Sequence, residues 1–196
     1  MDHSYFARRE NIELRPVQHE DIELLRNWRN SAESNRFLRN IGYITDRMQE
    51  EWFESYLADE SEVLFAIEDK LLGVPVGSVS LYDIDLSAGT ASIGKIMIGD
   101  PRGHGKGIGR TALVMTMKMG FRFLKLTKIL GSVHPDNIQA YTNDMRVGFR
   151  VVGECISAVS GKEHLIEITE EDALKTNKYY NEIMIFDKTK DKNAFM

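Results

Sequence analysis

The sequence lacks several features that mark particular classes of protein. Its single cysteine, Cys155, excludes an intramolecular disulfide, and no spacing of Cys and His resembles a zinc site. No stretch approaches the roughly 18–20 consecutive apolar residues of a membrane helix. The first residues contain no apolar core of the kind found in signal peptides. We therefore expect a cytoplasmic protein that holds no metal.

An excess of positive charge is also missing. The 196 residues include 25 Lys and Arg against 30 Asp and Glu, which gives a formal net charge of −5. A protein whose main task is binding nucleic acid normally carries a basic excess, so we expect no nucleic-acid partner. The length is that of one domain, which we place at residues 10–186. Residues 1–9 and 187–196 are expected to be flexible ends.

Hydrophobic periodicity predicts strands and helices that follow one another along the chain. Strand patterns occupy residues 12–17, 63–67, 76–82, 91–98, 128–133, 151–159, 165–169 and 180–186. Helical patterns occupy residues 20–28, 45–57, 108–126 and 137–147. Interleaved strands and helices indicate an α/β or α+β fold with a mixed sheet.

The most informative segment is the loop from Arg102 to Arg110, between a predicted strand and a predicted helix. Four glycines in seven residues, 103–109, allow positive φ angles and a close approach of backbone to a ligand. Successive N–H groups at a helix N-terminus form an anion site. Arg102, Lys106 and Arg110 add positive charge. We therefore expect this loop to bind a phosphate or pyrophosphate.

Three other interpretations of this loop fit less well. A Walker A loop needs a hydroxyl residue after its lysine, and Gly107 follows Lys106. A dinucleotide-binding loop needs an acidic residue about twenty positions further on, where residues 126–128 contain none. A flexible loop without a ligand would weaken the start of the helix with no gain.

A fourth interpretation rests on two motifs. Arg102-x-x-Gly105-x-Gly107 resembles the (Q/R)-x-x-G-x-(G/A) signature of the GNAT acetyltransferases. Asn137-x-x-Ala140, followed by Gly148-Phe149, is similar to a second motif of that family. The order of predicted elements over residues 91–154 also matches. The resemblance implies the GNAT fold, with about seven strands, about four helices and a splayed pair of strands at the acetyl-CoA site.

The resemblance implies acetyl-CoA as co-substrate and direct attack of an amine on the thioester. Backbone groups of the strand before the loop would bind the pantetheine arm, the loop would bind the pyrophosphate, and the Asn helix would support the thioester end. The implied cofactor-binding residues are Ile96, Met97, Ile98, Arg102, Gly103, His104, Gly105, Lys106, Gly107, Ile108, Gly109, Arg110 and Asn137.

The catalytic positions depart from the family pattern. Relatives often carry Tyr seven residues after the Asn, where this chain has Asp144, and Glu where it has Ser92. Asp144, the nearby Tyr141 or a water molecule would protonate the thiolate, although Asp144 is also explained as a solvated carboxylate and Tyr141 as core packing. His134 is a candidate base, or a residue that shapes the turn at Pro135.

The resemblance implies an amine as acceptor, and the residues that select this amine are expected in the N-terminal half of the chain. Trp28-Arg29-Asn30, with Phe37-Leu38 and Trp52, is most similar to aminosugar acetyltransferases, in which a tryptophan would stack on a ring and Arg29 or Arg36 would meet a nucleotide diphosphate. The alternative for both tryptophans is a place in the core. We expect an aminosugar or similar small amine as acceptor.

Other functions stay open. A protein N-terminus, as in ribosomal-protein acetyltransferases, or spermidine is an alternative acceptor, and acidic residues such as Glu50, Glu51 and Asp83 would suit a polyamine. Without the usual Glu and Tyr, the chain is alternatively an inactive relative or an acetyl-CoA sensor. The long segment 156–186 is the basis for expecting a homodimer.

Overall fold

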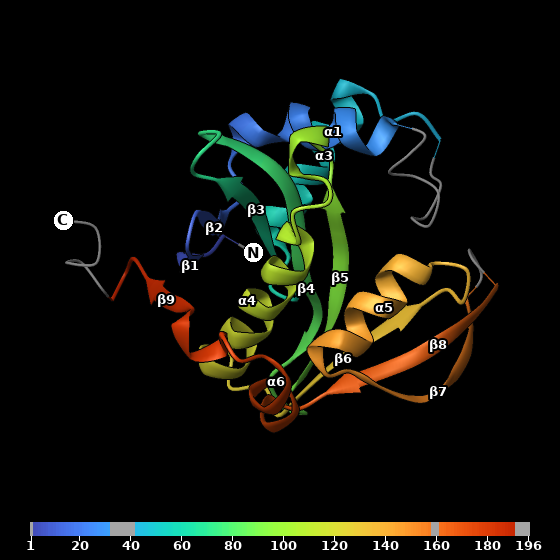
Figure 1. Ribbon diagram of the computed structural model, residues 1–196. Helices are drawn as coiled ribbons and strands as arrows, with labels where there is room; N and C mark the ends of the chain where they lie inside the picture. Colours follow the sequence, from blue (N-terminus) through green and yellow to red (C-terminus); the bar gives the residue numbers. More distant parts are fainter. Residues whose placement is uncertain (1, 32–41, 158–160, 191–196) are drawn as a thin grey trace.

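A nine-stranded mixed sheet forms the centre of the molecule, with helices on both of its faces (Figure 1). The computed structural model describes residues 2–31, 42–157 and 161–190. The strand order is β7-β8-β6-β5-β4-β3-β2-β1-β9. Most neighbours are antiparallel, whereas β5 and β6 are parallel. The mixed sheet expected from the sequence is confirmed.

The bounds of the elements agree closely with most of the predicted segments. The strands are β1 (Tyr5–Arg9), β2 (Ile12–Pro16), β3 (Val63–Asp69), β4 (Val74–Asp85), β5 (Thr90–Ile98), β6 (Lys128–Val133), β7 (Arg150–Ser157), β8 (Gly161–Ile168) and β9 (Met184–Asp187). The α-helices of the described residues are α1 (Ile22–Asn30), α3 (Asp46–Ala58), α4 (Ile108–Arg122), α5 (Ile138–Val147) and α6 (Glu170–Thr176). Short 3-10 helices are η1 (His19–Asp21), η2 (Pro101–Gly103) and η3 (Tyr180–Glu182).

Alternation along β3 separates the two faces of the sheet. Phe65 belongs to the larger core under α4, together with Met115 of that helix. Leu64 and Ala66 point to the other face, where Trp28 of α1 and other side chains of α1 and α3 cover them. Successive side chains of a strand point to opposite faces, so β3 anchors both helix layers. The helices α5 and α6 share the face of α4.

The parallel pair β5–β6 separates after three residues. The two strands pair at Thr90, Ala91 and Ser92 of β5. Among the described residues, no strand pairs with that side of β5 from Ile93 to Ile98. On its other side, β5 stays paired with β4, with an extra residue at Lys95, whose φ is +51°. Such a β-bulge bends the strand. The expected splayed pair is therefore present.

Both chain ends that we predicted to be flexible contribute to the sheet. Tyr5–Arg9 forms β1, which pairs with β2 and β9. Ala7 is fully buried, and Phe6 stacks on Phe186 with 5.7 Å between ring centroids. Asp187 is 4% exposed and accepts a hydrogen bond from Ser4. The prediction was wrong for Tyr5–Arg9 and for Asp187, because residues far apart in sequence bury these strands together. Residue 1 and residues 191–196 lie outside the described part.

Three further differences concern the C-terminal half. Helix α6 was not predicted, although Thr169 and Asp172 form the capping box that signals a helix start. Helix α4 ends at Arg122 rather than at residue 126, and Lys125 adopts a left-handed φ of +58°. The expected strand 180–186 is reduced to β9, because residues 180–182 form η3, whose Tyr180 carbonyl accepts a hydrogen bond from Lys118.

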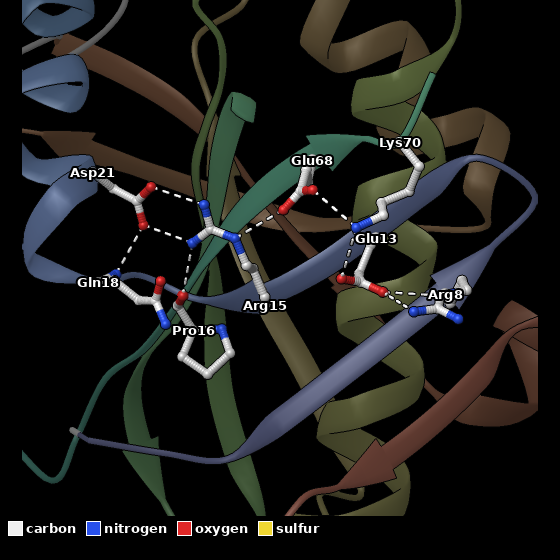
Figure 2. A network of polar contacts seen from close by, with 8 residues as sticks. All are labelled: Arg8, Glu13, Arg15, Pro16, Gln18, Asp21, Glu68 and Lys70. Carbon is white, nitrogen blue, oxygen red and sulfur yellow. Dashed lines mark hydrogen bonds and ion pairs between the residues drawn. The ribbon is translucent and has the colours of Figure 1, made fainter. Parts of the chain in front are cut away.

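A network of charged side chains fixes the entry into α1 (Figure 2). Arg15 of β2 donates hydrogen bonds of 2.6 and 2.8 Å to Asp21 and one of 3.0 Å to Glu68 of β3. Asp21 also accepts a hydrogen bond of 2.8 Å from the backbone N–H of Gln18. Because Arg15 bridges two carboxylates, it holds η1 and the start of α1 against the sheet.

The same network continues along β2 toward β1 (Figure 2). Glu13 is 5% exposed and lies opposite Glu68 in the strand register. Lys70 lies 3.0 Å from Glu68 and 3.8 Å from Glu13, and Arg8 donates a hydrogen bond of 2.9 Å to Glu13. The buried carboxylate of Glu13 is thus paired with two cations far from β5.

Trp28 of α1 packs directly on the backbone of Gly99, the residue after β5. A Cβ atom on Gly99 would lie 2.1 Å from Cγ of Trp28, far inside van der Waals contact. We expect Gly99→Ala to lower the free energy of unfolding by about 1–3 kcal/mol, because a rigid ring must move. Chemical denaturation measures this loss. Gly153→Ala is the control, since its Cβ meets no atom nearer than 3.8 Å; equal losses in both variants would contradict the contact.

Candidate active site

The glycine loop connects β5 to α4 through a concave stretch of backbone. Gly105 and Gly107 both have φ of +73°, and Gly107 is the N-cap of α4. A Cβ on Gly105 would meet no atom within 4 Å, so the space above the loop is open. The left-handed conformations that glycine permits let this backbone turn its N–H groups outward.

The loop presents a set of N–H donors and positive charges. Ile108, Gly109 and Arg110 open the first turn of α4, where N–H groups lack intrahelical acceptors, and the first bond of the helix joins Thr111 to Gly107. The dipole of this 15-residue helix adds positive potential. Within the described part of the chain, Lys106 and Arg110 form no salt bridge. These residues therefore fit a pyrophosphate.

The start of α4 also opens onto a hollow of about 570 Å³. Lys106, Gly107 and Arg110 line it from the loop. Arg9 lines it from the end of β1, and Tyr179 from the segment after α6. The guanidinium carbon of Arg9 lies 4.2 Å from the ring centroid of Tyr179. The N-terminus of α4 is thus accessible from this side.

Three of the predicted loop donors have protein partners. Arg102 donates hydrogen bonds of 2.6 and 3.0 Å from its side chain to Asp100, and its N–H also binds Asp100. The same contacts lower the pKa of Asp100. The N–H of Gly103 donates to the carbonyl of Asp100, and the ring of His104 lies 2.8 Å from the carbonyl oxygen of Ile98. In this conformation these groups shape the loop rather than face its open side.

Ile96 to Ile98, the strand positions predicted for the pantetheine arm, lie in the part of β5 that pairs with β4 but not with β6. Met97 is 8% exposed and packs in the core under α1 and α3, so its backbone, not its side chain, is available at the strand edge. An exposed strand edge pairs readily with an extended group that carries amides.

The turn after β6 and helix α5 contain the predicted catalytic residues, with His134 in the turn and Tyr141 and Asp144 in the helix. Asn137 caps it by accepting a hydrogen bond of 3.2 Å from the N–H of Ala140. Nδ1 of His134 accepts one of 3.1 Å from the N–H of Asp136, so His134 shapes this turn. The ring of Tyr141 packs against the larger core, 5.7 Å from the ring of His164.

Asp144 lies one turn beyond Tyr141 on α5. Its side chain is half-buried, and this burial raises the pKa of Asp144 to about 7. No hydrogen bond to its carboxyl group is found among the described residues. A carboxyl group with this pKa is partly protonated at neutral pH, which is the state a proton donor needs.

The residues that suggested a sugar acceptor are mainly structural. Trp28 is 8% exposed and packs in the core, as the alternative proposed. The amide of Asn30 forms two hydrogen bonds, of 2.9 and 2.8 Å, with the backbone of Ile44. Trp52 is half-buried and stacks on Tyr56. Burial lowers the pKa of Arg29. Arg36, Phe37 and Leu38 lie outside the described residues.

A polar cluster that the sequence did not reveal lies on the α1–α3 face, beside the bulge of β5. Glu62, just before β3, is 7% exposed and accepts a hydrogen bond of 2.6 Å from Ser80 of β4. Lys95 of the bulge donates another of 2.6 Å to Glu62 and lies 5.1 Å from the ring centroid of Tyr82. No motif connects these residues; only the pairing of β3, β4 and β5 brings them together.

The surroundings of Tyr82 are acidic. Burial raises the pKa of Tyr82, and the negative charges of Asp83, Glu163 and Glu62 raise it further. Glu163 belongs to β8, on the far side of the splayed strands from Tyr82. Carboxylates from three strand regions therefore act on one place, opposite Ser92, where the β5–β6 pair begins to separate.

The described residues contain neither a membrane-spanning helix nor a metal-binding group. No helix among them is long and apolar enough to span a bilayer. No group of three or more His, Cys, Asp and Glu side chains is arranged there to bind a metal ion.

The splayed strands, the glycine loop at the start of α4 and the Asn-capped α5 define an acetyltransferase. The sequence profile of the acetyltransferase (GNAT) domain matches residues 11–150, and the chain belongs to this family of acetyl-CoA-dependent N-acetyltransferases. The resemblance inferred from the two motifs is thereby confirmed. The match spans the loop and α5, and stops near the start of β7.

The chain is similar in sequence and in structure to spermidine N-acetyltransferases. Spermidine N(1)-acetyltransferase of Escherichia coli strain K12 is 28% identical over 144 residues, which cover 74% of this chain and 75% of that protein. The crystal structure of spermidine N-acetyltransferase from Vibrio cholerae, in complex with CoA and spermine, has a TM-score of 0.76 at 23% identity, covering 85% of this chain and 99% of that one. An F149G mutant of that enzyme has a TM-score of 0.73 at 23% identity, with coverage of 87% and 99%. These structures share the fold of this protein.

Proposed function

We propose that this protein transfers the acetyl group of acetyl-CoA to a primary amine of a polyamine such as spermidine. The observation that carries the proposal is the buried carboxylate of Glu62 beside Lys95 and Tyr82, where the β5–β6 pair begins to separate; Asp83 and Glu163 add negative charge there. Polyamines carry several ammonium groups and bind where carboxylates converge. The similarity to spermidine acetyltransferases supports the same acceptor. An aminosugar has less support, because Trp28 and Asn30 are structural.

The residues of the cleft have distinct roles in this reaction. Acetyl-CoA supplies a thioester that a neutral amine attacks directly. Gly105 to Arg110 would bind its pyrophosphate through N–H groups, and the free edge of β5 would hold the pantetheine arm as an added strand. A strand N–H near the bulge at Lys95 would stabilise the oxyanion that develops.

The reaction also requires a proton for the leaving thiolate, and the attacking amine must lose one. Asp144 is the residue that we assign as proton donor, because burial keeps a fraction of it protonated at neutral pH. Tyr141, one turn earlier, packs against the core and His134 shapes the turn before α5, so both are assigned supporting roles. Asn137 supports the same end of the cleft by capping α5.

Release of CoA thiol across a panel of amines tests the acceptor. We expect turnover with spermidine, and at least tenfold lower kcat/KM with amino-dideoxy nucleotide sugars and with peptides that begin with Ser or Ala. Turnover confined to sugars or peptides would reject the polyamine. Calorimetric binding of acetyl-CoA without release of thiol on any amine would instead indicate a sensor or an inactive relative.

A further inference from the structure

Glu62 is a buried carboxylate whose two oxygens are both occupied by groups from other strands. Ser80 donates to Oε1 and Lys95 to Oε2, each over 2.6 Å. Among the described residues, Lys95 is its one cationic partner. A carboxylate that is 7% exposed is costly to leave without a cation, so its place in the fold depends on an ammonium group beside it.

The strand register places this carboxylate beside the acetyl-transfer site. Ser80 pairs with Gly94 of β5, and Tyr82 pairs with Ser92, the position where relatives often carry Glu. Both pairs lie on the α1–α3 face, next to the residues of β5 that have no partner from β6. Glu62, from the start of β3, therefore places a carboxylate beside the Ser80–Gly94 pair, which is the next pair on this face after Tyr82–Ser92.

Lys95 reaches Glu62 from the solvent side. Its side chain is 45% exposed, whereas that of Glu62 is 9% exposed. The alkyl chain of Lys95 starts at a bulge residue with a left-handed φ, so it is not locked into the regular ladder of β5. An ammonium group of a polyamine is chemically equivalent to that of Lys95. An exchange between them keeps the carboxylate paired, so Glu62 pays no new desolvation cost.

We propose that Glu62 binds an ammonium group of the acceptor in place of Lys95, and so selects cationic polyamines over neutral amines. The inference rests on the proposed function and names the residue that would give it specificity. Lys95 then acts as an internal competitor that neutralises Glu62 when no acceptor is bound.

Steady-state kinetics of Glu62→Gln with spermidine and acetyl-CoA tests this assignment. The amide keeps the size of the side chain but removes its charge. We expect the KM for spermidine to rise at least tenfold, kcat to change less than threefold, and the calorimetric affinity for acetyl-CoA to stay the same. A purely structural role would lower kcat and acetyl-CoA affinity together with the melting temperature.

Glu13→Gln provides the matched control. Glu13 is as buried as Glu62 and as closely paired with cations, but it lies on β2, away from the splayed strands. We expect its KM for spermidine to equal that of the wild type. An unchanged KM in Glu62→Gln, or an equal rise in Glu13→Gln, would overturn the inference.

Lys95→Met tests the exchange separately and does not depend on the folding of Glu62→Gln. Removing the competitor should lower the KM for spermidine about threefold or more, whereas a higher KM would contradict the exchange. Failure of the wild type to acetylate any polyamine would reject the proposed function itself, and this inference with it. Turnover of spermidine with no effect of either variant on its KM would reject this inference alone.

Discussion

Gly107→Val should weaken acetyl-CoA binding at least a hundredfold while leaving the protein folded. Gly107 has φ of +73° at the N-cap of α4, and a β-branched residue is strained there by about 1–3 kcal/mol. The backbone escapes this strain by turning its N–H groups away from the open side of the loop, and the new methyl groups cover the same space. Isothermal titration with acetyl-CoA measures the loss.

Gly73→Val separates loss of binding from backbone strain. Gly73, in the turn between β3 and β4, has φ of +67° and open space around its Cβ, so valine is strained there in the same way. We expect both variants to lose similar thermal stability, and Gly73→Val to keep the affinity of the wild type. Equal acetyl-CoA affinity in Gly107→Val and the wild type would show that the loop does not bind the pyrophosphate.

Asp144→Asn should lower kcat about a hundredfold, since a positioned general acid contributes roughly 10²–10⁴ in rate. Asparagine has the same shape but carries no transferable proton. In the wild type, burial raises the pKa of Asp144 to about 7, so activity should decline above this pH as the proton is lost. The variant should lose this alkaline decline and keep only the rise that comes from deprotonation of the amine. Profiles of kcat against pH measure both effects.

The same burial has a consequence for stability that needs no substrate. The pKa of Asp144 is higher in the folded than in the unfolded protein, so its contribution to the free energy of unfolding is fully present below about pH 4 and is lost as pH rises through about 7. Asp144→Asn should lack this loss. Asp136→Asn, at an exposed residue of the turn before α5, is the control for the stability measurement.

For catalysis, an unchanged kcat in Asp144→Asn would reject Asp144 as the proton donor.

Local chemistry alone predicted the backbone features of the glycine loop and of α5, which we propose for acetyl-CoA binding. The glycines at 105 and 107 occupy left-handed positions, as their spacing indicated, and Asn137 and Gly148 cap the two ends of α5. These features are readable because a cap or a tight turn depends on residues within a few positions of one another. The pattern of strands and helices followed for the same reason, since periodicity is a property of a short segment.

Features that depend on contacts between distant segments could not be obtained in this way. Tyr5–Arg9 appeared to be a loose end because its partner β9 lies about 180 residues further along the chain. Trp28 was predicted to stack on a sugar ring because it is a large aromatic residue, but in the structure its ring packs against the backbone of Gly99. Arg102 belongs to the phosphate motif, yet Asp100 engages its side chain.

The sequence by itself determined the family and the co-substrate, because the two motifs that carry the resemblance are short continuous segments. It also predicted the loop that we propose for the pyrophosphate, since such a site can be built from one continuous stretch of backbone. Only the tertiary structure brought together the residues that we propose for the acceptor. Glu62, Ser80 and Lys95 meet only because three antiparallel strands adopt one register, with a bulge at Lys95. A shift of one residue in any of these strands would send its side chain to the opposite face of the sheet.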